Sequence, residues 1–244
     1  MKLSGNTFLI TGGSAGIGLA LARRFLERDN TVIICGRSQA RLQEALGIHK
    51  GLKGRVCDVG NVSERLELAR WIRENYPHTN CLVNNAGVQR RMELENDEPW
   101  EAVQAELRIN LEAPIHLCRL FAPLLKKNAS ATILNVTSGL SFVPLANVPV
   151  YSATKAALHS FTQSLRHQYH GKIEVIEIIP PAVQTDLGGP GLHDFGVPLD
   201  EFADSIVAQL ASNEREVAYG SAAFNRTASR ADLDEVFRHI NSKP

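Results

Sequence analysis

The sequence predicts an α/β fold, a single domain in which a doubly wound parallel sheet of about seven strands carries helices on both faces. Short apolar runs alternate with longer amphipathic runs along the whole chain, and a glycine-rich turn follows the first apolar run. Strands that alternate with helices form βαβ units, which place crossover helices on both faces of a sheet. The 244 residues suit one such domain, and no linker, repeat or low-complexity stretch divides them. We therefore expect residues 1–244 to form one unit.

The apolar runs and the helical periodicity give the expected elements. The expected strands are residues 7–11, 31–35, 54–58, 81–85, 131–138, 173–179 and a shorter candidate at 216–220. The expected helices lie near residues 16–28, 38–46, 61–75, 97–126, 149–170 and 199–211. Leu233, Val236, Phe237 and Ile240 stand at helical spacing. They predict a last helix, packed either on the body of the domain or over the site of a neighbouring subunit.

Two expected loops, at residues 88–96 and 188–198, follow the fourth and sixth strands. In an open parallel sheet, loops at the carboxyl ends of the strands border the ligand crevice. Both loops are therefore candidates for substrate contact. Arg90 and Arg91 in the first loop would suit an anionic substrate, although exposed arginines are more often simply solvated.

Charge and composition exclude several classes of partner. Lys plus Arg and Asp plus Glu number 26 each, a balance that argues against nucleic acid or an anionic membrane as the main partner. No apolar run approaches the roughly 20 residues of a membrane helix, and the first strand is too short for a signal-peptide core. Cys35, Cys57, Cys81 and Cys118 show no CxxC spacing. We expect buried reduced thiols in a cytoplasmic protein, with no metal site.

The stretch "TGGSAGIG" at residues 11–18 lies between the first strand and the first helix. Glycine permits positive φ and a close backbone approach, and a helix N-terminus presents free N–H groups to a phosphate. The turn could exist without a ligand, but its place in the first βαβ unit favours a Rossmann-type nucleotide site. The candidate contacts are Gly12, Ser14, Gly16, Ile17 and Gly18.

The second strand ends in "ICGRS", where NAD-preferring sites usually carry an acidic residue for the ribose 2′-hydroxyl. Here Gly36 and Arg37 stand instead, so no carboxylate repels a 2′-phosphate and a guanidinium is available to pair with it. We therefore expect NADP(H) to be preferred, with NAD(H) still possible. The alternative is that Arg37 points to solvent and Ser38 only caps the next helix.

Tyr151 and Lys155 in "PVYSATKAAL" stand four residues apart, on one face of the expected helix. Pro149 suits a first-turn position, so the phenol would lie near a helix N-terminus. Lowering a phenol pKa by roughly 3 units requires about 4 kcal/mol, whereas one exposed ion pair supplies under about 1 kcal/mol. The pair is therefore a surface feature unless several positive charges meet in a partly dry cleft.

The expected long helix contains a proline, Pro114, which cannot donate to the carbonyl of Asn110. We expect a kink there, which leaves that carbonyl free for a water or a side chain. A plain proline kink is the alternative.

Six motifs follow one another in an order that resembles that of a known family. "TGGSAGIG", "NNAG" at 84–87, Asn110, Ser138 in "NVTSGL", "YSATK" at 151–155 and "PPAVQT" at 180–185 follow one another along the chain. The chain resembles the short-chain dehydrogenase/reductase family in its single-domain form, over nearly its whole length. The wording of residues 149–168 and 175–187 is similar to the DltE-like branch of oxidoreductases.

The resemblance implies the catalytic set Asn110, Ser138, Tyr151 and Lys155. Tyr151 would be the general acid/base, and Lys155 would lower its pKa and hold the nicotinamide ribose. Ser138 would bind the substrate oxygen, and the Asn110 carbonyl would position a water. The further cofactor contacts that the resemblance implies are Asp58, Val59, Asn85, Ala86, Gly87, Pro181, Val183 and Thr185. One departure is Pro180–Pro181 where the family commonly has Pro-Gly.

The implied activity is an NADP(H)-dependent oxidoreductase that moves a hydride between nicotinamide and a small carbonyl or alcohol substrate. A non-catalytic NADP(H)-binding sensor or scaffold is the alternative from another class. The extended branch of the same superfamily is a weaker one, because only the short stretch after Thr185 remains for a substrate region. Family members usually pair through the two long helices, so we expect a homodimer or homotetramer.

Overall fold

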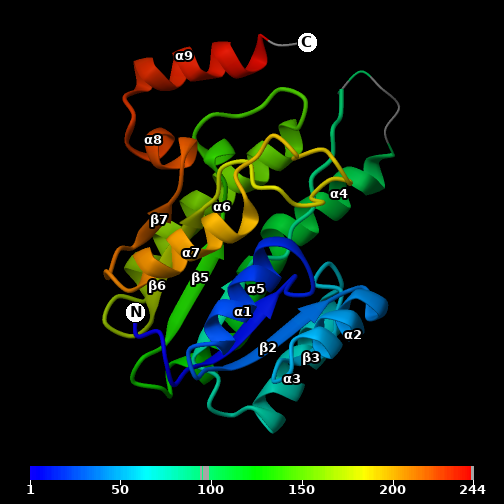
Figure 1. Ribbon diagram of the computed structural model, residues 1–244, viewed down its shortest axis with the longest axis vertical. Helices are drawn as coiled ribbons and strands as arrows, with labels where there is room; N and C mark the ends of the chain where they lie inside the picture. The colour runs from blue at the N-terminus through cyan, green and yellow to red at the C-terminus, as the bar shows by residue number, and fades with distance from the viewer. Residues whose placement is uncertain (94, 96–98, 243–244) are drawn as a thin grey trace.

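The computed structural model describes residues 1–93, 95 and 99–242, and these build one parallel sheet covered by helices (Figure 1). The strands are β1 (Thr7–Thr11), β2 (Thr31–Gly36), β3 (Lys53–Val56), β4 (Cys81–Asn84), β5 (Thr132–Val136), β6 (Glu174–Ile179) and β7 (Glu216–Ala218). Among the described residues their order is β3-β2-β1-β4-β5-β6-β7, and every neighbouring pair is parallel. The predicted fold class is confirmed, and each predicted strand is present within a few residues.

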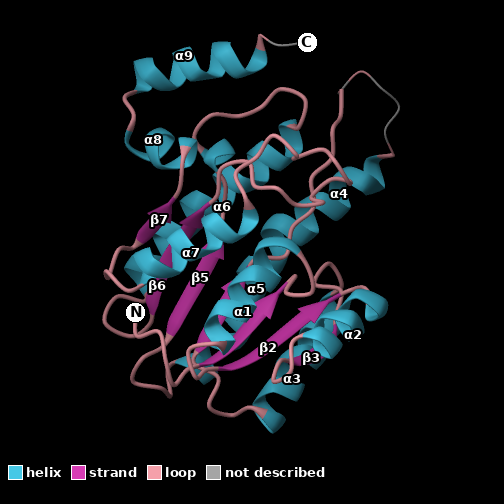
Figure 2. Cartoon of the chain, in the orientation of Figure 1, coloured by secondary structure: helices cyan, strands magenta, loops and turns pink. Residues whose placement is uncertain are grey.

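The helices form a layer on each face of the sheet (Figure 2). The first layer consists of α1 (Gly16–Leu26), α2 (Gln39–Ile48) and α7 (Leu199–Leu210). The second layer consists of α3 (Val62–Asn75), α5 (Ala113–Leu125) and α6 (Pro149–Gln168). The order of the strands reverses between β1 and β4, and ligands bind at such a switch point in doubly wound sheets.

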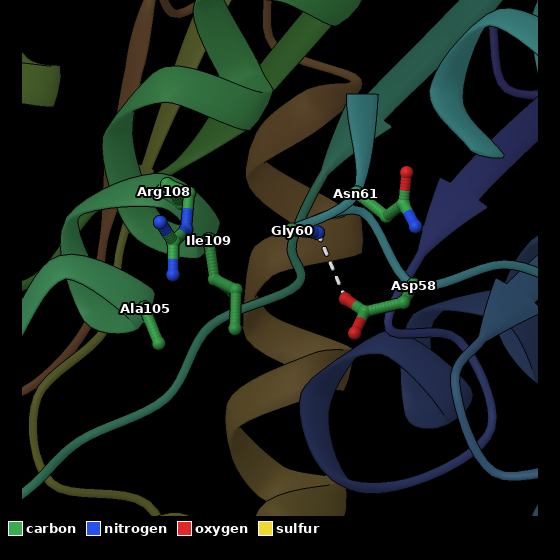
Figure 3. A pocket seen from close by; sticks show the side chains of 6 residues that line it. All are labelled: Asp58, Gly60, Asn61, Ala105, Arg108 and Ile109. Atoms are coloured by element: carbon green, nitrogen blue, oxygen red, sulfur yellow. Dashed lines mark hydrogen bonds between the residues drawn. The ribbon is translucent and has the colours of Figure 1, made fainter. Parts of the chain in front are cut away.

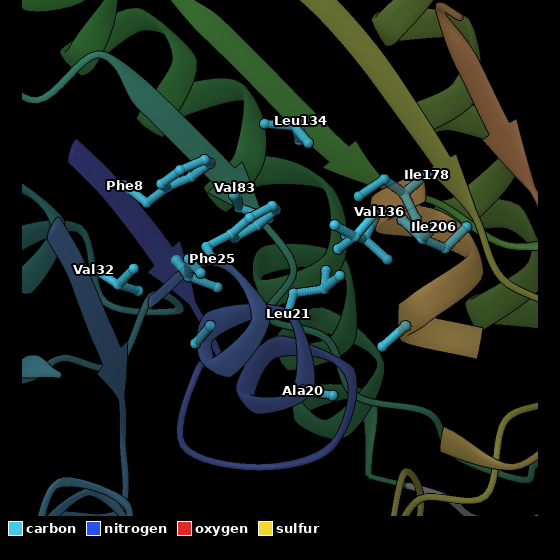
Figure 4. Close-up of a cluster of buried hydrophobic side chains, with 14 of the residues drawn as sticks. Phe8, Ala20, Leu21, Phe25, Val32, Val83, Leu134, Val136, Ile178 and Ile206 are labelled. Carbon is cyan, nitrogen blue, oxygen red and sulfur yellow. The ribbon is translucent and has the colours of Figure 1, made fainter. Parts of the chain in front are cut away.

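Alternation along the strands divides the apolar side chains between two cores. In β1, Phe8 and Ile10 join the core under α1 and α7, whereas Leu9 joins the core under α3 and α5. The rings of Phe8 and Phe25 stack with centroids 4.2 Å apart at the centre of the first core (Figure 4). Because both faces are covered, the strands read as continuous apolar runs.

The prediction of one uninterrupted helix at 97–126 is wrong in one respect, because a π-helical turn divides it. It consists of α4 (Trp100–Leu107), a π-helical turn at Arg108–Glu112 and α5, while residues 97 and 98 lie outside the described part. The irregularity therefore comes just before Pro114, which occupies the first turn of α5. An extra residue in one turn is a common way to accommodate a break in the hydrogen-bond ladder, and π-turns often mark functional sites.

The chain after β7 forms two helices, α8 (Ser221–Thr227), which the sequence analysis did not anticipate, and α9 (Arg230–Asn241). Helix α9 is the predicted last helix, but none of its residues is fully buried and Phe237 is 41% exposed. Its end is anchored by Asn241, which donates to the Pro144 carbonyl and accepts from the Ala146 N–H. Three of the apolar residues that predict the helix, Leu233, Val236 and Ile240, are half-buried.

All four cysteines are buried and none forms a disulfide, as predicted. Within the described ranges, no helix combines the length and the apolar character that crossing a membrane would require.

Candidate active site

The glycine turn after β1 is built for close backbone approach. Gly12 has φ +64°, and a Cβ there would lie 2.8 Å from the Ala86 Cα. A Cβ on Gly18 would lie 2.5 Å from the Gly12 carbonyl oxygen. Helix α1 begins at Gly16, so its free N–H groups face the end of the sheet. These features fit the phosphates of a dinucleotide, as the sequence predicts.

The "NNAG" segment supports this turn from the end of β4. Asn85 Nδ2 donates to the Thr11 carbonyl at 2.9 Å and to the Gly12 carbonyl at 3.2 Å. The Thr11 hydroxyl accepts from the backbone N–H groups of Asn85 and Ala86. Asn85 therefore holds the turn in shape, and the supporting role of Thr11 was missed because a threonine ending a strand carries no distinctive pattern.

A hollow of about 350 Å³ opens between the β3–α3 connection and the junction of α4 with the π-helical turn that follows it. Asp58, Gly60 and Asn61 form one wall, and Ala105, Arg108 and Ile109 form the other (Figure 3). Asp58 Oδ1 accepts from the Gly60 N–H at 2.8 Å, which fixes the carboxylate at the rim. Asp58 therefore lines a hollow, and its contact with adenine, which the resemblance implies, stays a prediction. The second wall was not predicted, because it lies on a helix far along the chain.

The end of β2 carries a glycine, Gly36, and an exposed arginine, Arg37, beside the glycine turn. A Cβ on Gly36 would lie 2.7 Å from the Ser14 Oγ, so the Ser14 hydroxyl covers this glycine. Arg37 is exposed, and no ion pair engages its guanidinium within the described chain. The Ser38 hydroxyl accepts from the Arg41 N–H and caps α2. Ser38 is therefore a cap, and the pairing of Arg37 with a 2′-phosphate stays a prediction.

Asn110 connects the loop after β4 to helix α6. Its side chain has no exposed surface. Its Nδ2 donates to the Val88 carbonyl at 2.8 Å and to the Thr154 hydroxyl at 3.2 Å, and its Oδ1 accepts from the Val88 N–H. The Thr154 hydroxyl in turn donates to the Tyr151 carbonyl. This side-chain role differs from the predicted role of the backbone carbonyl, which stays a prediction.

Tyr151 and Ser138 meet at the carboxyl edge of the sheet. Tyr151 lies in the first turn of α6, and Ser138 caps the short 3-10 turn Gly139–Ser141 that follows β5. Burial raises the pKa of the Tyr151 phenol well above its usual range, and the nearby Ser138 hydroxyl opposes that increase. The sequence analysis expected a lowered pKa. In the chain by itself desolvation dominates, so the depression requires charge that a bound cofactor would add.

Lys155 is also buried, and its Nζ donates to the Val136 carbonyl at 2.8 Å. The same Nζ lies 5.5 Å from the centre of the Tyr151 ring. Burial lowers the pKa of Lys155 to about 8, and the charge of Glu106 opposes that decrease. A Cβ on Gly87 would lie 3.8 Å from this Nζ and 3.5 Å from the Asn110 Oδ1. Gly87 therefore allows the backbone after β4 to pass close to both side chains.

Glu106 is a buried carboxyl that the sequence analysis did not single out. Burial raises its pKa to about 7, while Arg90 and Lys155 oppose the increase. Val103 and Glu106 of α4 and Asn110 of the following π-helical turn are all buried. The helical spacing of the three residues is visible in the sequence, but the burial of Glu106 is not.

The segment after β6 completes the site. A Cβ on Gly16 would lie 3.4 Å from the Thr185 Cγ2, so Thr185 lies against the glycine turn. The Pro180 carbonyl accepts from the Gly139 N–H, which places the Pro180–Pro181 pair beside Ser138. Three predicted cofactor residues turn their side chains toward the cores: Val59 and Val183 are buried there, and Ile17 packs against one.

The two predicted substrate loops approach each other across the edge of the sheet. A Cβ on Gly188 would lie 3.1 Å from the Gln89 carbonyl oxygen. Arg90 donates to the Ala102 carbonyl, so it anchors the first loop to α4. Residues 94 and 96 of the first loop lie outside the described part.

A parallel sheet with this strand order and this glycine turn defines a Rossmann-type protein. The short chain dehydrogenase family model matches residues 6–193. The chain is 45% identical to "Uncharacterized oxidoreductase DltE" of Bacillus subtilis, and the match covers 100% of this chain and 99% of that protein. It is 34% identical to a tropinone reductase homolog of Datura stramonium, over 76% of this chain and 71% of that one. The chain belongs to the short-chain dehydrogenase family.

A solved structure agrees with this assignment. The chain is similar to a short chain dehydrogenase from Burkholderia cenocepacia in complex with NADP, with a TM-score of 0.85 and 27% identity. The similarity covers 98% of this chain and 99% of that one.

Proposed function

We propose that this protein is an NADP(H)-dependent oxidoreductase that acts on a small carbonyl or alcohol substrate, with Tyr151 as general acid/base. The observation that carries the proposal is the meeting of Ser138, Tyr151 and Lys155 at the sheet edge, beside a turn shaped for phosphates. Nicotinamide supplies the hydride chemistry when it is bound, and the protein contributes orientation and proton transfer.

The ionisation of the free site favours a proton donor. Because burial raises the pKa of Tyr151, the phenol is neutral at physiological pH and ready to protonate an oxygen that Ser138 holds. Alcohol oxidation needs the phenolate instead, and therefore needs added positive charge near Tyr151. Lys155 supplies one such charge while it remains an ammonium. Without cofactor the site therefore holds the phenol in its protonated form, which is the form that carbonyl reduction uses, while the direction of the reaction depends on the charge that a cofactor adds.

The preference for NADP(H) rests on the end of β2. Arg37 is exposed beside Gly36, in a position that suits a 2′-phosphate, and the similar Burkholderia structure contains NADP. Replacing Arg37 by Ser is expected to weaken NADPH binding about tenfold, because one charge-assisted interaction is lost. NADH affinity should not change. Calorimetric titration measures both affinities, and Arg41→Ser, at an exposed position in the following helix α2, is the control. An equal loss for both cofactors would refute the assignment of Arg37.

The activity itself is tested by the decrease in NADPH absorbance with a panel of aldehydes, ketones and quinones. Turnover of any of them supports the proposal. Tight NADPH binding without turnover on a broad panel would favour the non-catalytic sensor instead.

We also propose a homodimer or homotetramer. Helix α6 leaves Ala153 and Ala156 exposed, small residues that permit close packing of a second helix. Sedimentation velocity tests this, and a monomer at micromolar concentration would contradict it. The cytoplasmic setting and the absence of nucleic acid and membrane partners stay predictions.

A further inference from the structure

Glu106 is buried without the partners that a buried carboxylate normally needs. Its side chain has no exposed surface, and neither carboxylate oxygen has a hydrogen-bond partner of normal geometry among the described residues, although the Arg90 backbone N–H is close enough to favour the anion. The Arg90 Nη1 lies 4.0 Å from Oε2, too far for a hydrogen bond, and this nitrogen already donates to the Ala102 carbonyl. A buried charge in such surroundings is costly unless another charge compensates it.

Lys155 likewise lacks hydrogen-bond partners for some of its N–H donors. An ammonium carries three N–H donors, and the only hydrogen bond of the Lys155 Nζ within the described structure goes to the Val136 carbonyl. Helix α4 packs against α6, and Asn110, one turn after Glu106, bonds to Thr154, the neighbour of Lys155 in α6. The Asn110 Oδ1 and the Lys155 Nζ both lie within 4 Å of the position that a Cβ on Gly87 would take. Two buried and incompletely paired groups of opposite charge thus share one region of the protein.

The charged and titratable groups around Glu106 come from two other elements. Arg90 approaches from the loop after β4, and Lys155 and Tyr151 belong to α6. Burial raises the pKa of Glu106 to about 7 and lowers the pKa of Lys155 to about 8. The charge of Glu106 raises the pKa of Lys155 and also that of Tyr151. Glu106 therefore becomes an anion over the same pH range in which Lys155 would otherwise lose its proton.

We propose that Glu106 is the countercharge that keeps Lys155 an ammonium, and that it thereby sets the upper pH limit of the Tyr151–Lys155 site. Glu106 is a positioning residue, because it acts on the substrate only through Lys155 and Tyr151. The inference rests on the proposed function for its kinetic consequence, but the charge coupling itself exists in the protein without cofactor. If Glu106 only held Arg90 in place, its replacement would alter the packing of the loop after β4 but would leave the pKa of Lys155 unchanged.

The test compares Glu106→Gln with the wild type and with Glu101→Gln. The amide keeps the size of the side chain and removes its charge, and Glu101 offers the same substitution at an exposed position on α4. In Glu106→Gln, the alkaline limb of the kcat/KM profile is expected to move to lower pH by about half a unit or more. This shift equals about a threefold lower kcat/KM on that limb. Glu106→Asp, which restores the charge, should recover part of the shift, and Glu101→Gln should show none.

A second measurement requires no turnover. In protein labelled with ¹³Cε-lysine, the Lys155 signal is identified by its absence from Lys155→Arg. Its titration midpoint should be lower in Glu106→Gln than in the wild type. Thermal unfolding confirms that each variant is folded. In a separate sample of the wild type with ¹³C-labelled glutamate, the Glu106 carboxyl should titrate near neutral pH.

An unchanged Lys155 midpoint in Glu106→Gln would overturn the inference, whatever the activity. If Glu106→Gln fails to fold, the Glu106 carboxyl decides through the reciprocal change. Removing the ammonium in Lys155→Met should raise the titration midpoint of that carboxyl, and an unchanged midpoint would also overturn the inference. Failure of the proposed function looks different: NADPH binding or turnover would be missing in the wild type, while the lysine titration would still respond to Glu106.

Discussion

Replacing Asn110 by Ala removes the link between the loop after β4 and helix α6. The substitution leaves the N–H and C=O of Val88 and the Thr154 hydroxyl without their Asn110 partner. Each unsatisfied buried polar group costs about 1–3 kcal/mol, and the Val88 groups are only partly buried. We therefore expect a loss of about 2–4 kcal/mol in unfolding free energy. For a chain of this size that loss lowers Tm by roughly 5–15 °C.

Thermal unfolding followed by circular dichroism measures this loss in the protein without cofactor. Asn75→Ala is the control, because Asn75 is exposed and its side chain donates only to the Trp71 carbonyl within the described chain. It should cost no more than about 0.5 kcal/mol. Since Thr154 also bonds to the Tyr151 carbonyl, kcat in Asn110→Ala should fall more than NADPH affinity. A Tm within about 1 °C of the wild type would refute the linking role of Asn110.

Two further changes probe the glycine turn and the α6–sheet contact. In calorimetric titration, Gly18→Ala should bind NADPH about tenfold or more weakly, because the new Cβ would lie 2.4 Å from the Asn85 Nδ2 and shift the turn. Gly47→Ala is the control and should bind NADPH normally, because nothing lies within 4 Å of the position of its Cβ. His159 Nδ1 lies 2.9 Å from the buried Glu177 carboxylate, which raises the pKa of His159. The stability from this pair is therefore complete below about pH 6.5 and is lost as pH rises through the raised pKa of His159. Denaturant unfolding should show that His159→Gln loses more unfolding free energy at pH 6 than at pH 8.5. An equal loss at both pH values would contradict the pairing.

The strands and most helices were predictable because burial on both faces of a parallel sheet leaves continuous apolar runs. Residues 7–11 and 31–35 are the simplest examples. The π-turn at Arg108–Glu112 was not predictable, since its residues continue a helical pattern and only Pro114 signals a disturbance. Helix α8 was missed because its residues 221–227 are too short a stretch for a periodic signal.

The sequence predicted the elements that carry the candidate site residues but not the electrostatics of these residues. Spacing put Tyr151 in the first turn of α6, and the structure places it there. The sequence contained no measure of desolvation, so the raised pKa of Tyr151 was not foreseen. The same reason hid Glu106, because a glutamate in a helix is normally solvated and its burial depends on how α4 packs against α6.

Loss of the phenolic hydroxyl tests the central claim most directly. Tyr151→Phe keeps the ring in its buried position and removes only the proton donor. Calorimetry with NADPH, followed by turnover on any substrate that the wild type reduces, separates cofactor binding from proton transfer. We expect NADPH affinity within about threefold of the wild type and a fall in kcat of about 10²-fold or more. Turnover at the wild-type rate with normal NADPH binding would contradict the assignment of Tyr151 as the acid/base.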